Sequence, residues 1–173
     1  ARMGWWSPMS RAVLPLDELR VTRSLAKSAR HFQVTVDEDF AGVLAGCADP
    51  SREGGWIDGE IADVYGQLHR AGIVHSVETW DAEGRLVGGL YGVSLGGLFA
   101  GESMFHDPEH GRDASKVALM ELVRILASDG VPRLLDVQWL TGHLESMGAV
   151  EIERTDYLEL LGRSLDLPAP RWG

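Results

Sequence analysis

Three consecutive segments decide the fold: VHSVETW at 74–80, LVGGLYGVS at 86–94 and LFAGESMF at 98–105. Each segment is rich in β-branched and aromatic residues, and short turn sequences at 81–84 and 96–97 separate them. Strand segments joined by such short turns pair as antiparallel hairpins. We therefore predict a three-stranded antiparallel meander at the centre of the chain.

Other segments on both sides of this meander also show a clear period. Apolar residues recur at helical spacing in 115–127, and an apolar run typical of a central strand follows at 133–139. The N-terminal 15 residues show no regular spacing of apolar residues. Further expected elements are strands at 19–22 and 32–36 and helices at 24–31, from Asp58 to Gly72, at 143–147 and at 155–165. A further short helix, which Asp37 can cap, extends through Cys47.

The order of these elements resembles the N-acyltransferase architecture. Strands, a helix, another strand and a helix around an antiparallel meander form a mixed sheet with helices on both faces. We predict the α/β (α+β) class and an acetyltransferase-like (GNAT-like) fold, in which helices flank a central, mostly antiparallel sheet. The sequence shows no internal repeat and no interdomain linker.

The composition is that of one globular domain. Of 173 residues, 45% are hydrophobic and 24% are charged, which is the balance of a folded chain. The single cysteine, Cys47, excludes an intrachain disulfide and a multi-cysteine zinc site. No apolar run approaches the roughly 20 residues that a bilayer span needs, and no signal peptide opens the sequence. We therefore expect a reducing, cytoplasmic setting and no membrane partner.

The net charge of −10 taken alone argues against a nucleic-acid partner. However, residues 1–32 carry six basic and two acidic side chains, whereas the other 141 residues carry 10 basic and 24 acidic ones. The first part therefore has a charge of +4 and the rest −14. Such asymmetry indicates a charged partner, although a solvated basic helix face gives the same pattern.

Polar residues interrupt two of the apolar strands. In LLDVQW at 134–139, Asp136 and Gln138 share one face because side chains alternate along a strand. Glu102 lies among glycine, methionine and phenylalanine. On neighbouring strands, Glu102 and Asp136 would form an anionic site for a cationic group or near a nucleophilic amine. Two alternatives stay open: an aspartate at the exposed end of a strand that binds backbone amides, and a glutamate exposed on an edge strand.

Metal and phosphate sites have weaker support. His106 and His110 stand four apart, but a proline and a glycine break the helical register, and we predict no metal site. Segment 111–115 lies where an acetyltransferase would wrap CoA, yet it offers one glycine and an aspartate, which counts against acetyl-CoA. Glycines between 88 and 101 could admit a ligand close to the sheet, although turns and bulges also use glycine.

Eight motifs then occur in the order of one known family: WWSP at 5–8, RS at 23–24, WI at 56–57, HSVE at 75–78, VGGLYGV at 87–93, GESMF at 101–105, ASK at 114–116 and DVQ at 136–138. From Trp5 to about Leu161, the chain resembles the leucyl/phenylalanyl-tRNA–protein transferases. The resemblance implies an enzyme that moves leucine or phenylalanine from aminoacyl-tRNA to proteins with N-terminal arginine or lysine, marking them for N-degron proteolysis. It implies no cofactor, since aminoacyl-tRNA is a substrate, and we expect a monomer.

The resemblance also implies roles for particular residues. Glu102 and Asp136 would hold the basic N-terminal residue of the acceptor, and Gln138 would orient its α-amino group, so we expect these three to be catalytic. We expect Asp136 to orient and polarise Gln138. The aminoacyl side chain would enter a pocket lined by Leu90, Phe99, Met104, Leu119, Leu122 and Leu135.

The expected tRNA contacts lie in the first part of the chain and at Trp56. The terminal adenosine would stack near Trp56 and one of the pair Trp5 and Trp6, as the resemblance implies. The basic segment, with its charge of +4, is the expected place for tRNA phosphates. Its candidate residues are Arg20, Arg23, Lys27 and Arg30.

We predict two parts: residues 1–32, a remnant that carries the Trp-Trp motif and the basic segment, and residues 33–173, an acetyltransferase-like catalytic domain. The family has a smaller domain before the WWSP motif, and we expect it to be absent because four residues precede Trp5. Two other functions stay open. One is an acetyl-CoA-dependent N-acetyltransferase, and the other is a non-catalytic tRNA- or peptide-binding module.

Overall fold

A computed structural model of the chain describes residues 7–49 and 57–172. Its strands are β1 (Ser10–Val13), β2 (Gln33–Val36), β3 (Val74–Trp80), β4 (Leu86–Leu95), β5 (Leu98–His106), β6 (Leu134–Gln138) and β7 (Val150–Glu153). Its helices are the 3-10 turn η1 (Leu16–Glu18), α1 (Arg23–Ala29), α2 (Phe40–Cys47), α3 (Gly59–Arg70), α4 (Ala114–Ala127), α5 (Gly142–Ser146) and α6 (Arg154–Leu165).

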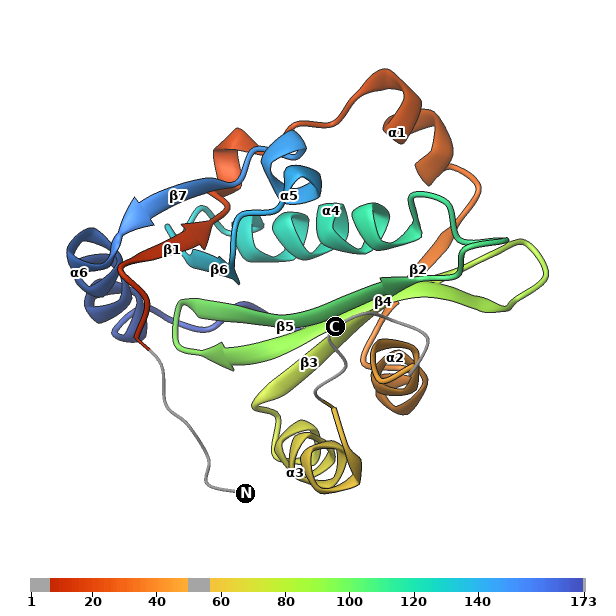
Figure 1. The fold of residues 1–173 in the computed structure, drawn as a ribbon, viewed down its shortest axis with the longest axis horizontal. Coiled ribbons are helices and arrows are strands. Elements are labelled where there is room, and N and C mark those ends of the chain that lie inside the picture. The colour runs from red at the N-terminus through yellow and green to blue at the C-terminus, as the bar shows by residue number, and fades with distance from the viewer. Residues whose placement is uncertain (1–6, 50–56, 173) are drawn as a thin grey trace.

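The seven strands form one sheet in the order β2-β3-β4-β5-β6-β1-β7. Among the described strand pairs, only β5 and β6 run parallel. Figure 1 shows α4 on one side of β3, β4 and β5, with α2 and α3 on the other side. The predicted class, a mostly antiparallel sheet flanked by helices in the acetyltransferase-like order, is confirmed.

Side-chain alternation along the meander divides the core into two layers. Val77 of β3 lies opposite Leu90 of β4, which lies opposite Met104 of β5. This row packs in the core cluster that contains Leu119 and Leu122 of α4. The opposite face contributes Val74, Tyr91 and Phe105 to a second cluster with α2 and α3. The strands are thus buried on both faces, as their apolar sequences require.

Three local predictions are wrong. Residues 19–22 do not form a strand: they lead into α1, and the Thr22 hydroxyl caps that helix by accepting the Leu25 N–H at 3.1 Å. The cap of α2 is Asp39, which accepts the Gly42 N–H at 2.9 Å, rather than Asp37. Strands β1 and β7 were not predicted, and they extend the sheet beyond β6.

The sheet includes part of the segment that was predicted separately as residues 1–32. Strand β1 pairs with β6 on one side and with β7 on the other, and Leu14 lies in the same core cluster as α4.

In the described part of the chain, no helix combines the length and the hydrophobicity that crossing a bilayer requires.

Close packing explains most of the glycines of the meander. Those at 88, 89, 92, 96 and 97 approach other parts of the protein closely, so the interpretation that they admit a ligand is wrong for these five. At Gly88, an added Cβ would lie 2.5 Å from the Cβ of Ala114 on α4. At Gly101, its nearest neighbour would be the Asp136 carbonyl oxygen at 3.4 Å.

This contrast predicts a difference in stability. Gly88→Ala should lower the free energy of unfolding by about 2 kcal/mol, because the methyl group overpacks the contact between β4 and α4. Gly101→Ala should change it by less than about 1 kcal/mol, since the space is open. Urea unfolding curves of the two variants and the wild type would measure both values. Equal losses in the two variants would contradict the packing explanation.

Candidate active site

A cavity of about 210 Å³ lies beside β5 and β6, where α4 and α5 approach the sheet. Its wall is largely apolar, and Glu102 and Gln138 are among the polar residues that line it. The structure brings all six residues predicted for the aminoacyl pocket together in this wall: Leu90, Phe99, Met104, Leu119, Leu122 and Leu135. The predicted pocket residues and two of the predicted catalytic residues therefore share one cavity.

Two irregularities in the sheet create this site. Between β4 and β5 the register shifts so that Glu102 is an extra residue, a β-bulge, and bulges redirect side chains near active sites. The parallel pairing of β5 with β6 includes Ala100 opposite Asp136 and extends no further. Beyond this pair, Gln138 has a backbone φ of 68°, which ends the strand. The bulge and the strand end place Glu102 and Gln138 side by side.

The Gln138 side chain is held by its amide nitrogen. Nε2 donates to the carbonyl oxygen of Gly101 at 2.8 Å and to Oε2 of Glu102 at 3.3 Å. Within residues 7–49 and 57–172, no donor is found for its Oε1. This oxygen can therefore accept an N–H from a substrate in the cavity.

Glu102 is a half-buried carboxylate on a central strand, since β5 lies between β4 and β6. The alternative of an exposed glutamate on an edge strand is therefore wrong. Burial raises the pKa of Glu102 above its ordinary value, although hydrogen bonds from Tyr65 and Gln138 favour the ionised form. A carboxylate in this setting binds a cationic group strongly, because a bound cation replaces the water that burial removed.

Asp136 is 1% exposed and fully partnered. Arg11 Nε lies 3.0 Å from both carboxylate oxygens, and Arg11 Nη2 lies 2.9 Å from Oδ2. The Tyr157 hydroxyl donates to Oδ2 at 2.7 Å, and the Gln138 backbone N–H donates to Oδ1 at 2.7 Å. Asp136 does accept a backbone N–H, but the alternative of an aspartate at the exposed end of a strand is wrong, because Asp136 is buried.

The structure places the predicted anionic pair on neighbouring strands, as expected, but gives the two carboxylates different surroundings. Glu102 lines the cavity, whereas Asp136 is turned to Arg11 and Tyr157. With its charge already balanced, Asp136 is better suited to position Gln138 than to bind a second cation. Direct binding of the acceptor's cation by Asp136 stays a prediction.

Several residues of the site were missed by the sequence analysis. Tyr65 of α3 hydrogen-bonds Glu102, but its helical spacing indicated only core packing. Arg11 was counted solely as part of the basic segment, and Tyr157 lay within an ordinary helical pattern. Trp139 follows Gln138 and lines the cavity with an indole that is 56% exposed. No local signal in one sequence marks these residues.

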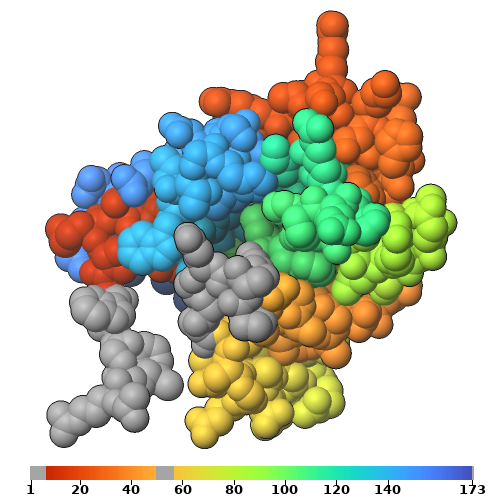
Figure 2. All heavy atoms as spheres, turned by 45° about the vertical axis from the view of Figure 1, so that its right-hand side comes forward, coloured from red at the N-terminus to blue at the C-terminus, as the bar shows by residue number. Residues whose placement is uncertain are grey.

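The predicted tRNA contacts are only partly visible. Arg20, Arg23, Lys27 and Arg30 are all exposed in α1 and its flanks. Figure 2 shows this red-orange segment at the upper edge of the molecule. Trp5, Trp6 and Trp56 lie outside the described residues.

The structure adds no support for the metal site or for the CoA phosphate site, which the sequence supported only weakly. In the described part of the chain, no three histidine, cysteine, aspartate or glutamate residues gather in a way that could hold a metal ion. At the start of α4, where CoA phosphates would bind in an acetyltransferase, Asp113 pairs with Lys116 at 3.5 Å. A carboxylate at this position repels a phosphate.

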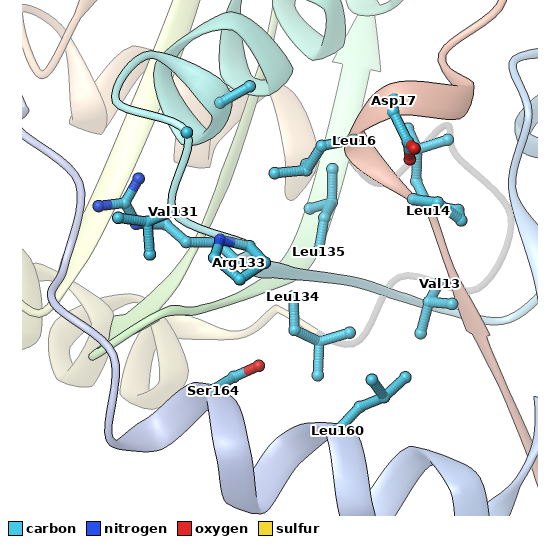
Figure 3. A pocket seen from close by; sticks show the side chains of 14 residues that line it. Val13, Leu14, Leu16, Asp17, Val131, Arg133, Leu134, Leu135, Leu160 and Ser164 are labelled. Carbon is cyan, nitrogen blue, oxygen red and sulfur yellow. The ribbon is translucent and has the colours of Figure 1, made fainter.

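A larger cavity of about 510 Å³ lies elsewhere, between β1, β6 and α6 (Figure 3). Its labelled side chains are mostly apolar, and the guanidinium of Arg133 points away from them. That guanidinium binds Asp129 and the carbonyl oxygens of Pro168 and Ala169. Apart from Arg133, the polar residues of the larger cavity are Asp17 and Ser164. The smaller cavity, which contains both Glu102 and Gln138, is the better candidate active site.

The fold and the smaller cavity fit the class of acyltransferases, since an apolar pocket adjoins a carboxylate and an amide. The sequence profile of leucyl/phenylalanyl-tRNA protein transferases matches residues 13–162. The chain belongs to this family of enzymes.

Individual relatives agree with the family assignment. The transferase of Ruegeria sp. (strain TM1040) is 51% identical over 166 residues, which cover 95% of this chain and 76% of the relative. That of Rhizorhabdus wittichii is 50% identical over 169 residues, which cover 95% and 66%. Among solved structures, L-PGS from Bacillus licheniformis is similar with a TM-score of 0.49 and 13% identity, covering 77% of this chain and 48% of the other.

Proposed function

We propose that this chain transfers leucine or phenylalanine from aminoacyl-tRNA to the α-amino group of proteins with N-terminal arginine or lysine, marking them for N-degron proteolysis. The observation that carries the proposal is the cavity in which Glu102 and Gln138 adjoin six apolar residues. An apolar pocket suits the side chain of leucine or phenylalanine. The adjacent carboxylate suits the cation of arginine or lysine.

The proposed reaction is attack of the acceptor amine on the aminoacyl ester. The amine nitrogen forms a bond to the ester carbonyl carbon, and the bond from that carbon to the ribose oxygen of the tRNA breaks. The proton lost by the amine leaves through solvent or passes to the departing ribose oxygen. A free α-amino group has a pKa of about 7.7–8.0, so a useful fraction is neutral near neutral pH. The ester is already activated, and alignment of amine and ester provides most of the acceleration.

The residues around the cavity have separate roles in this proposal. Oε1 of Gln138 accepts an N–H of the acceptor amine and aims its lone pair at the ester. Glu102 binds the guanidinium or ammonium of the acceptor's first side chain. Asp136 holds Gln138 in place through the backbone N–H at 2.7 Å.

Leucine transfer provides the direct test. The chain would be incubated with charged leucyl-tRNA and a peptide that starts with arginine, with an otherwise identical peptide that starts with alanine as the control. Transfer to the first peptide alone supports the proposal. Transfer to neither contradicts it, and calorimetric binding of acetyl-CoA would favour the N-acetyltransferase alternative.

A second prediction concerns the tRNA. Replacing Arg20, Arg23, Lys27 and Arg30 by glutamine should weaken tRNA binding and flatten its dependence on salt. For each phosphate that the variant no longer neutralises, the slope of log K against log salt should fall by about 0.7 to 0.9, because fewer counterions are released. Binding would be measured at several salt concentrations. Arg163→Gln, which removes an exposed charge on α6, is the control, and an unchanged slope in the fourfold variant would rule out this segment as the tRNA site.

A further inference from the structure

Three separate elements converge on the Asp136 carboxylate. Arg11 comes from β1, Tyr157 comes from α6, and the Gln138 N–H belongs to the end of β6 itself. The Arg11 guanidinium also lies 5.7 Å from the centre of the Tyr157 ring, so the two donors contact each other. A charge-assisted cluster of this kind fixes the orientation of its carboxylate.

The carboxylate in turn fixes an unusual backbone conformation. Gln138 has a φ of 68°, in the left-handed region that residues other than glycine rarely adopt. Such conformations persist only where the surroundings hold them, and they concentrate at functional sites. Here the hydrogen bond from the Gln138 N–H to Oδ1 of Asp136 holds the main chain. The Gly101 carbonyl holds the side-chain amide.

An ion pair balances the charge of the buried carboxylate. The groups that face Asp136 are Arg11 from β1, Tyr157 from α6 and Glu102 from β5. Burial lowers the pKa of Arg11, but the hydrogen bond and charge of Asp136 raise it overall. Burial, followed by Asp136, raises the pKa of Tyr157, so Tyr157 remains a proton donor. Arg11 is thus the cation that balances a carboxylate otherwise costly to bury.

We propose that Arg11 and Tyr157 are positioning residues for the transfer reaction. Together they hold the Asp136 carboxylate, which fixes the left-handed backbone of Gln138 and aims the Gln138 amide into the cavity. Asp136 therefore acts through the main chain of Gln138 instead of touching substrate. The assignment of these roles to transfer rests on the proposed function.

The kinetic test compares Arg11→Met and Tyr157→Phe with the wild type, and Arg163→Met serves as a control that removes an exposed arginine. Arg11→Met should lower kcat about 10- to 100-fold, because the amide is misaligned. KM for the arginine peptide should change less than about twofold, since Glu102 is untouched and uniform binding is retained. Tyr157→Phe should lower kcat less, because Arg11 still balances the charge.

Rescue by a conservative variant separates positioning from a merely structural role. Without Arg11, the buried carboxylate loses the cation that balances its charge and the charge-assisted bonds that this cation donates. The kcat of Arg11→Met should therefore fall while the protein stays folded, whereas a loss due to unfolding would follow the unfolded fraction. Arg11→Lys, which restores a cation, should recover part of kcat. Wild-type kcat in Arg11→Met, or a loss that only tracks unfolding, would overturn the proposal.

A second measurement does not depend on activity. In the free protein, the backbone amide proton of Gln138 should resonate downfield by NMR because it is bonded to a carboxylate. It should also exchange slowly with solvent. Both properties should weaken in Arg11→Met and, less so, in Tyr157→Phe. If the wild type transfers no leucine, the proposed function fails, while an amide signal that is unchanged in both variants overturns the positioning role itself. If Arg11→Met does not fold, Tyr157→Phe and Arg11→Lys still test the proposal.

Discussion

Gln138→Ala should lower kcat for leucine transfer about 100-fold and leave tRNA binding unchanged, because the amide aligns the attacking amine and contributes nothing to binding of the tRNA body. The physical basis is the geometry of the amide: Nε2 is held by Gly101 and Glu102, which leaves Oε1 for the substrate. Transfer rates and tRNA affinity would be measured separately, with the arginine peptide at saturation.

Asp136→Asn tests the same arrangement at the residue that holds the Gln138 backbone. The aspartate accepts hydrogen bonds from Arg11, Tyr157 and the Gln138 N–H, whereas an asparagine has one acceptor oxygen and an NH₂ group that would face donors. A loss about as large as that of Gln138→Ala is expected, since the Gln138 backbone is released. Gln67→Ala, an exposed glutamine on α3, is the matched control. A wild-type rate in either site variant would exclude the proposed mechanism.

Glu102→Gln should raise KM for an arginine-starting peptide roughly 10- to 100-fold, because the variant removes one partner of a desolvated ion pair. A peptide that starts with an uncharged residue should be affected far less. Transfer kinetics with both peptides would measure the difference. Glu109→Gln, at an exposed glutamate, is the control, and equal effects on the two peptides would show that Glu102 does not select the basic residue.

The pH dependence of KM adds a check with a defined sign. Burial raises the pKa of Glu102 above the ordinary value, so the carboxylate is ionised above that raised pKa and protonated below it. KM for the arginine peptide should therefore rise as pH falls, and the change should occur above the usual range of glutamate. In the Glu102→Gln variant, KM should not show this rise as pH falls. A wild-type KM that begins to rise only in the pH range of an ordinary glutamate, with a pKa of about 4.3, would contradict the assignment.

The centre of the fold could be predicted because its signals are local. The segments of β3, β4 and β5 are rich in strand-forming residues and are bounded by turns, and α4 has a long helical period, so their bounds differ from the predicted ones by about one residue. β2 and β7 have four residues each, QVTV and VEIE; both alternate, so β7 could have been predicted as β2 was. β1, SRAV, shows no alternation, so its place in the sheet depends on its partners. The segment 19–22 looked extended because the residues before a helix cap are extended, and no local pattern distinguishes them from a strand.

The same distinction applies to the candidate site. The joint site of Glu102 and Asp136 required neighbouring strands, and β5 does pair with β6. The prediction from alternation that Asp136 and Gln138 share one face is wrong, because the left-handed backbone at the strand end turns Gln138 into the cavity beside Glu102, whereas Asp136 faces Arg11 and Tyr157. Arg11, Tyr65 and Tyr157 could not be placed from the sequence, because they reach the site from β1, α3 and α6 through contacts between distant parts of the chain. Surface charge already explained the arginine, and packing of a helix already explained the two tyrosines. The glycines near 88–97 were ambiguous for a similar reason, since packing partners are invisible in one sequence.

The position of β1 in the sheet has a consequence for synthesis on the ribosome. β1 leaves the ribosome before the other described strands, whereas its partners β6 and β7 emerge after β2, β3, β4 and β5. Arg11 and Asp136 are 125 residues apart in the sequence. A nascent chain can complete the meander and α4 while β1 still waits, and pairing over such distances is intrinsically slow. The carboxylate that holds Gln138 therefore meets its counter-ion only after the meander and α4 have emerged, so the active site is assembled after this central part of the fold.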